Sequence, residues 1–90
     1  MASFTVKVGS TVGLHARPAT IISEKAAELD ADVTIATPGG EPVDADSALL
    51  IMTLGAGPGD EVIVASDDET AARTIADLVE LDLDDASYPA

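Results

Sequence analysis

Apolar residues recur at two different spacings along this chain, at every second residue in some segments and at every third or fourth in others. The order of these segments limits the possible folds more than any other feature. From Phe4 to Val8 every second residue is apolar, which predicts a strand with one buried face. A helix is predicted from about Ala16 to Leu29, because its apolar residues fall on one stripe, at Ala19, Ile22, Ala26 and Leu29. Strand spacing returns at Val33 and Ile35. The chain is therefore expected to open as strand, helix, strand.

Turn residues divide the second half in the same way. A Pro-Gly-Gly turn at 38–40 predicts a hairpin that leads into a short strand at Val43. A short helix is predicted over Ala48–Leu54, ended by a glycine and capped by either Asp46 or Ser47.

A Gly-Pro-Gly-Asp turn at 57–60 precedes a predicted fourth strand, Glu61–Ser66. The acids at 67–69 suit the start of a last helix, where the helix dipole favours negative charge. Its expected buried stripe is Ala72, Ile75, Ala76 and Val79. The acidic tail from Asp82 to Ala90 is expected to fray.

The resulting order, β-α-β-β-α-β-α, predicts an α+β fold in one domain over residues 1–90. Hydrophobic residues make up 47% of the chain, but alanine supplies 16 of them, so the core must be small and aliphatic. We expect an open-faced sandwich, in which three helices cover one face of a mainly antiparallel four-stranded sheet. The other face would meet water, which suits Thr5, Lys7 and Thr34.

The charge balance excludes several kinds of partner. Seventeen acids against four bases give a net charge of −13, which argues against nucleic acid and anionic membranes. So much self-repulsion in a small domain suggests a halophilic protein from a cytoplasm with very high salt. No cysteine is present, which excludes disulfide scaffolds and thiol nucleophiles. No signal peptide or bilayer-length apolar run is seen, so we expect a soluble, cytoplasmic protein.

The single histidine, His15, follows a glycine-containing loop and opens the first helix. Pro18 fits only the first turn of a helix, where its missing N–H costs no hydrogen bond. The helix start offers N–H groups and a positive dipole end to an anion, and Arg17 adds a planar set of donors for phosphate oxygens. A neutral imidazole is a nucleophile near neutral pH. We therefore interpret His15 as a phosphoryl acceptor, with Arg17 and the backbone amides of Ala16 and Arg17 holding the phosphate.

A plainer interpretation is that His15 is a surface residue or a helix cap. A metal site is disfavoured, because no second His or Cys can join it and no metal is expected. A hydrolase triad is disfavoured for the same reason.

The run His15-Ala16-Arg17-Pro18-Ala19 resembles the active-site motif of the phosphocarrier protein HPr family of the sugar phosphotransferase system. The segments 30–33 and 47–55 are also similar to that family. The resemblance implies a four-stranded antiparallel sheet with three helices. It also implies a stoichiometric carrier, not an enzyme, with no cofactor, and we expect a monomer. Phospho-Enzyme I would donate to Nδ1 of His15, and the acceptor would be a sugar-specific IIA domain or a dihydroxyacetone kinase phosphotransfer subunit.

Ser47 has two interpretations. In some bacterial members of the family the matching serine is a regulatory kinase site. Here Ala48 follows it, where the family usually has a large aliphatic residue, and Asp44 and Asp46 would repel a phosphate. A helix cap alone would explain the serine.

The docking surface is expected to differ from that of bacterial members, which carry lysines on the first helix to meet acidic partners. The matching positions here are Glu24 and Ala27. The residues expected near His15 are mostly apolar, and they are Thr20, Leu49, Leu50 and Met52. Core packing is their alternative role, although Ile51 and Leu54 have the better spacing for it.

Two other functions compete with the carrier. One is a regulatory HPr-like protein that binds partners without onward phosphotransfer. The other is a pantetheine carrier, suggested by Asp46-Ser47 at a helix start in a small acidic domain. The strands predicted at Phe4–Val8 and 61–65 speak against the second, because acyl carrier proteins are all-helical.

Overall fold

The structure is a computed structural model that describes residues 1–11 and 13–81. Its elements follow the expected order: β1 (Ala2–Lys7), α1 (Ala16–Glu28), β2 (Val33–Ala36), β3 (Val43–Asp44), α2 (Ala48–Thr53), β4 (Glu61–Ser66) and α3 (Glu69–Glu80). The tail that we expect to fray lies outside the described residues. No helix in the described part is long and apolar enough to cross a bilayer.

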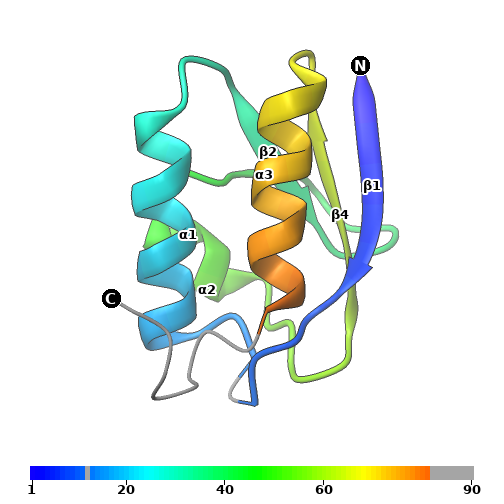
Figure 1. Ribbon diagram of the computed structural model, residues 1–90. Coiled ribbons are helices and arrows are strands. Elements are labelled where there is room, and N and C mark those ends of the chain that lie inside the picture. Colours follow the sequence, from blue (N-terminus) through cyan, green and yellow to red (C-terminus); the bar gives the residue numbers. More distant parts are fainter. Residues whose placement is uncertain (12, 82–90) are drawn as a thin grey trace.

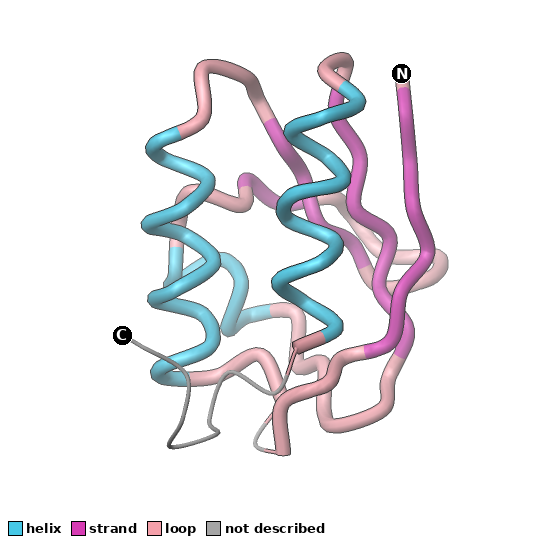
Figure 2. The backbone as a smooth tube through the Cα atoms, in the orientation of Figure 1, coloured by secondary structure: helices cyan, strands magenta, loops and turns pink. Residues whose placement is uncertain are grey.

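The four strands form one antiparallel sheet in the order β1-β4-β2-β3. In its centre, Val64 of β4 lies between Phe4 of β1 and Ile35 of β2. Figures 1 and 2 show α1 and α3 side by side in front of the sheet, and α2 packs against α1 beside β3. The predicted open-faced sandwich is thus confirmed.

The core lies between the helices and the sheet. The predicted stripes of α1 and α3 both face it: Ala19, Ile22 and Ala26 are buried, Leu29 is partly buried against them, and all four stripe residues of α3 are buried. On the other face of the sheet, Thr5 and Lys7 are exposed and Thr34 is half-buried. The two spacings of apolar residues therefore gave the correct buried faces.

Local polar contacts explain where the helices begin. Ser47, not Asp46, caps α2, because its Oγ accepts a hydrogen bond from the backbone N–H of Leu50 at 3.3 Å. Asp68 caps α3 by accepting from the N–H of Ala71 at 3.2 Å. The Ser47 cap is one of the two predicted for α2, whereas the acids at 67–69 were expected only to favour the start of α3 through their charge.

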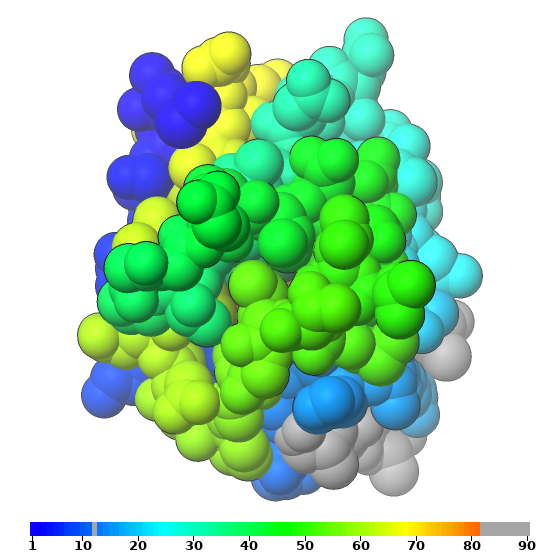
Figure 3. Space-filling model, turned by 180° about the vertical axis from the view of Figure 1, so that it is seen from behind, coloured from blue at the N-terminus to red at the C-terminus, as the bar shows by residue number. Residues whose placement is uncertain are grey.

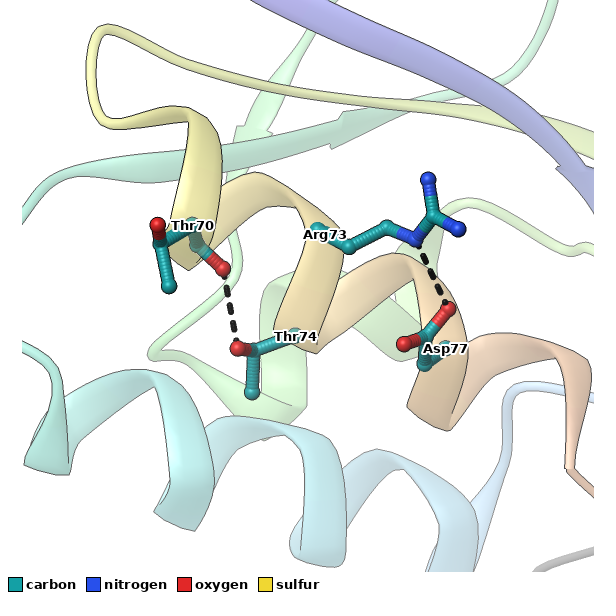
Figure 4. Close-up of polar contacts among 4 residues, drawn as sticks. All are labelled: Thr70, Arg73, Thr74 and Asp77. Carbon is teal, nitrogen blue, oxygen red and sulfur yellow. Dashed lines mark hydrogen bonds and ion pairs between the residues drawn. The ribbon is translucent and has the colours of Figure 1, made fainter.

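The outer face of α3 makes its own polar contacts (Figure 4). Thr74 Oγ1 donates to the carbonyl of Thr70 at 2.9 Å, and Arg73 Nε lies 3.4 Å from Asp77 Oδ1. The Arg73 guanidinium also lies 5.4 Å from the centre of the Phe4 ring, which ties α3 to the edge strand β1.

Candidate functional site

His15 is exposed and stands at the N-cap position of α1. Its backbone is extended, with φ −121° and ψ 164°, and its side chain makes no capping hydrogen bond. The imidazole is therefore not a helix cap, which was one of the two plainer interpretations of His15. The ring is available to a molecule that approaches the helix start.

The next residue, Ala16, has a strained backbone. Its φ of 45° lies in the left-handed region, and Ala16 is the only residue other than glycine with positive φ among the described ones. This conformation costs a non-glycine residue about 1–2 kcal/mol. Thr20 supports the turn, because its Oγ1 donates to the carbonyl of Ala16 at 3.0 Å. Strain of this kind is characteristic of functional sites. The amino-acid sequence gives no sign of this turn, since alanine is not a residue that favours the left-handed region.

Two glycines hold the loop before His15 against the rest of the fold. The N–H of Gly9 donates to the carbonyl of Val79 at 2.9 Å, at the end of α3. Gly13 has φ +75° and lies so close to Ala56 that a Cβ there would be 2.5 Å from the Ala56 carbonyl oxygen. The next residue, Leu14, is fully buried, and its N–H donates to that same carbonyl at 3.0 Å. The backbone therefore fixes where the chain emerges at His15.

Arg17, a cation, lies two residues after His15 in the first turn of α1. Arg17 is half-buried, with its Nε in the interior. The backbone amides of Ala16 and Arg17 come before the first hydrogen bond within the helix, in which Ala19 N–H donates to the carbonyl of His15 at 3.5 Å. Amides in this position need acceptors outside the helix, and phosphate oxygens are well suited to them. Pro18 is buried in this first turn, as expected.

The expected docking residues differ in exposure. Leu49 is 70% exposed and Leu50 is 37% exposed, whereas Met52 is half-buried and packs against the core. Seen from behind, the surface of α2 lies directly against that of the first turns of α1 (Figure 3). Helix α2, which carries the two exposed leucines, therefore packs against α1, the helix that begins after His15. Ile51 is fully buried and Leu54 is partly buried, in line with their expected core roles.

Ser47 is half-buried at the start of α2. Its hydroxyl oxygen accepts the capping hydrogen bond from Leu50, which gives the serine a structural role.

Comparisons with known proteins agree with this geometry. The family model for the PTS HPr component phosphorylation site matches residues 2–82. The phosphocarrier protein HPr of Streptomyces coelicolor is 44% identical over 81 residues, which cover 90% of this chain and 87% of that protein. Among solved structures, HPr from Bacillus anthracis has a TM-score of 0.77 at 33% identity, covering 87% of this chain and 95% of that one. HPr-C-His from Thermoanaerobacter tengcongensis has a TM-score of 0.80 at 30% identity, covering 89% and 92%. By sequence, fold and family model alike, the chain belongs to the HPr family of phosphocarrier proteins.

Proposed function

We propose that His15 accepts a phosphoryl group from phospho-Enzyme I, ultimately from phosphoenolpyruvate, and passes it to a downstream acceptor in the cytoplasm. The acceptor is a sugar-specific IIA domain or a dihydroxyacetone kinase phosphotransfer subunit. The observation that carries the proposal is the exposed imidazole at the start of α1, which makes no capping hydrogen bond. The protein acts as a stoichiometric carrier without turnover of its own.

The transfer itself is an exchange of bonds at phosphorus. The lone pair of His15 Nδ1 forms the new N–P bond while the bond from phosphorus to the donor atom breaks, and the donor atom keeps that electron pair. Nε2 retains its proton. The same exchange then runs from His15 to the acceptor. Such transfers depend on positioning and on electrostatic stabilisation of the phosphoryl oxygens more than on acid–base groups of the protein.

The groups around His15 suit those two tasks. The loop contacts of Gly13 and Leu14 hold the backbone of the helix start. The guanidinium of Arg17 and the amides of the first turn supply donors for three phosphoryl oxygens. Because this charge is already in place, little has to reorganise when the phosphoryl group arrives.

The test replaces the acceptor atom. His15→Ala should take up no phosphoryl group from phosphoenolpyruvate and Enzyme I, and its fold should be intact because His15 is exposed. Intact mass and far-UV circular dichroism are measured on the same sample. A phosphorylated His15→Ala protein would refute the assignment.

The same mass measurement on the parent protein separates the competing functions. An acid-labile phosphoryl adduct identifies a carrier. A stable pantetheine adduct identifies an acyl carrier, and no adduct after incubation with Enzyme I identifies a regulatory protein.

A further inference from the structure

The first turn of α1 is held less firmly by its backbone than the first turns of α2 and α3. In each helix the carbonyl of the N-cap residue accepts a hydrogen bond from the N–H four residues later. That bond is 3.5 Å long in α1, from Ala19 to His15, but 3.0 Å long in both α2 and α3. The N-cap side chains of α2 and α3 also accept a hydrogen bond, whereas that of His15 makes none. The start of α1 therefore depends more on other contacts.

A side chain from the second turn of α1 supplies one such contact. Thr20 Oγ1 donates to the carbonyl of Ala16 at 3.0 Å, and both residues are exposed. Ala16 is the residue with a φ of 45°, a conformation that alanine rarely adopts. The net contribution of one hydrogen bond is of the same size as the cost of a left-handed alanine. The hydroxyl of Thr20 is therefore strong enough to decide whether this turn keeps its conformation.

One peptide group links this hydrogen bond to the candidate site. The peptide between Ala16 and Arg17 is planar and trans, so its C=O and its N–H point in opposite directions. Thr20 lies one turn further along α1, so a carbonyl that accepts from its hydroxyl points along the helix, away from the helix start. The N–H of Arg17 then points toward the helix start, where His15 stands at the N-cap. Rotation of this peptide would turn that N–H away from a phosphoryl group on His15.

We propose that Thr20 is a positioning residue for phosphoryl transfer. Its hydroxyl fixes the Ala16 carbonyl and thereby directs the N–H of Arg17 at the phosphoryl group on His15. This inference rests on the proposed function, because it assigns Thr20 a part in that transfer. Thr20 acts through the backbone and needs no contact with the reacting atoms.

Helix α3 contains the same hydrogen bond in a regular stretch of helix (Figure 4). Thr74 Oγ1 donates to the carbonyl of Thr70 at 2.9 Å, again four residues back along the chain. Thr70 does not have a positive φ, and both threonines lie within α3. Threonines commonly make this bond in helices, so the bond alone is no sign of function. Thr74 is therefore a matched control, which reports what the bond contributes to stability alone.

The experiment compares Thr20→Val, Thr20→Ser and Thr74→Val with the parent protein. Valine keeps the shape of threonine without the hydroxyl, serine keeps the hydroxyl, and the three residues have similar helix propensities. Single-turnover phosphorylation is measured with two donors, phospho-Enzyme I and phosphoramidate. Phosphoramidate is a small molecule, so it needs no protein docking surface. Its P–N bond breaks as the new bond from phosphorus to Nδ1 of His15 forms, and its nitrogen, which carries three protons at neutral pH, leaves as ammonia.

Thr20→Val should slow phosphorylation about two- to tenfold with both donors, the effect of one hydrogen bond, whereas Thr20→Ser should stay within about twofold of the parent. Thr74→Val should react at the parent rate. Both valine variants should lower the urea midpoint of unfolding slightly and to a similar extent. A second readout is the nuclear Overhauser effect between the N–H and Hα protons of Ala16, which is strong at positive φ because the two protons lie close together. It should be strong in the parent and in Thr20→Ser, and weaker in Thr20→Val.

Three results would overturn the inference while the parent is phosphorylated normally. The first is a parent rate in Thr20→Val with both donors. The second is a loss of rate with phospho-Enzyme I alone, which would make Thr20 a docking residue. The third is an equal loss of rate in Thr20→Ser, or an Ala16 signal that Thr20→Val leaves unchanged.

The two donors also separate this inference from the proposed function. A parent protein that reacts with phosphoramidate but not with phospho-Enzyme I would reject the proposed function, and the rates with phosphoramidate would still decide the role of Thr20. A parent protein that reacts with neither donor would reject both.

Discussion

Gly13 allows a quantitative test of how the loop holds His15. Adding a methyl group there, in Gly13→Ala, has two costs. At φ +75° the alanine backbone is strained by about 1–2 kcal/mol. The new Cβ would also lie 2.5 Å from the Ala56 carbonyl oxygen and 2.9 Å from Gly57 Cα, and both are backbone atoms that move only with the loop. Overpacking of this kind costs about 1–3 kcal/mol. The sum predicts a loss of about 2–5 kcal/mol in the free energy of unfolding.

Gly39→Ala is the matched control. Gly39 has φ +78°, almost the same conformation, but nothing lies within 4 Å of its Cβ position. It should therefore show the backbone cost alone, about 1–2 kcal/mol. The difference between the two variants measures the collision with Ala56 and Gly57.

The assay combines urea unfolding with single-turnover phosphotransfer. Gly39→Ala should transfer at the parent rate, because the β2–β3 turn lies away from His15. Gly13→Ala should transfer more slowly even under conditions where it is fully folded, since a displacement of about 1 Å can cost about 10²-fold in rate. Equal stability losses in the two variants, or a parent-like rate in Gly13→Ala, would show that the loop adjusts freely and that our account of its anchoring is wrong.

Three further predictions concern charge and capping. Arg17→Ala should slow single-turnover transfer by about 10²–10³. Arg17→Lys should recover only part of the lost rate, because an ammonium lacks the planar donor set. An unchanged rate in Arg17→Ala would show that the residue has a structural role. Ser47→Ala should lower the free energy of unfolding by about 1 kcal/mol through loss of the α2 cap, without slowing phosphorylation of His15, and an unchanged urea midpoint would contradict the capping role. At a net charge of −13 the melting temperature should rise steeply with KCl, and a flat curve up to molar salt would count against a halophilic protein.

The elements of this fold were predictable because each has a strong local signal. The alternation around Phe4 and the stripe from Ala72 to Val79 show which face is buried, whatever the rest of the chain does. Turns were equally clear: Pro38 and Gly39 form a turn closed by Gly40 N–H donating to the Thr37 carbonyl at 2.9 Å. Signals of this kind depend on a few neighbouring residues and therefore can be read from sequence.

What the sequence did not show depends on contacts between distant segments. Leu14, Ala45 and Ala56 lie in loops or at their edges, and all three are buried in the core. Their burial follows from how the loops close over the helices, which no periodic pattern records. Met52 lies within α2 and is half-buried against the core, so Leu49 and Leu50 are the more exposed of the three apolar residues expected to dock a partner.

In the candidate site, too, the residue types could be predicted from the sequence, whereas their contacts could not. His15 and Arg17 stood out as residue types at a helix start, and the structure places both there. The left-handed backbone of Ala16 and its support by the Thr20 hydroxyl did not stand out. We expected Thr20 only as a docking residue, because the sequence does not show which carbonyl group a threonine one turn into a helix will bind.

The loop that carries His15 is fixed by backbone atoms on both sides. A side chain at Gly9 would collide with the Glu80 carbonyl, just as one at Gly13 would meet that of Ala56. Carbonyl groups are the same whichever amino acids carry them, so substitutions on the outer surface leave these two contacts unchanged. A lineage could therefore replace exposed residues with acids, one by one, while the histidine kept its position. The surface could then adapt to a new solvent or a new partner without moving His15, as long as both glycines were kept.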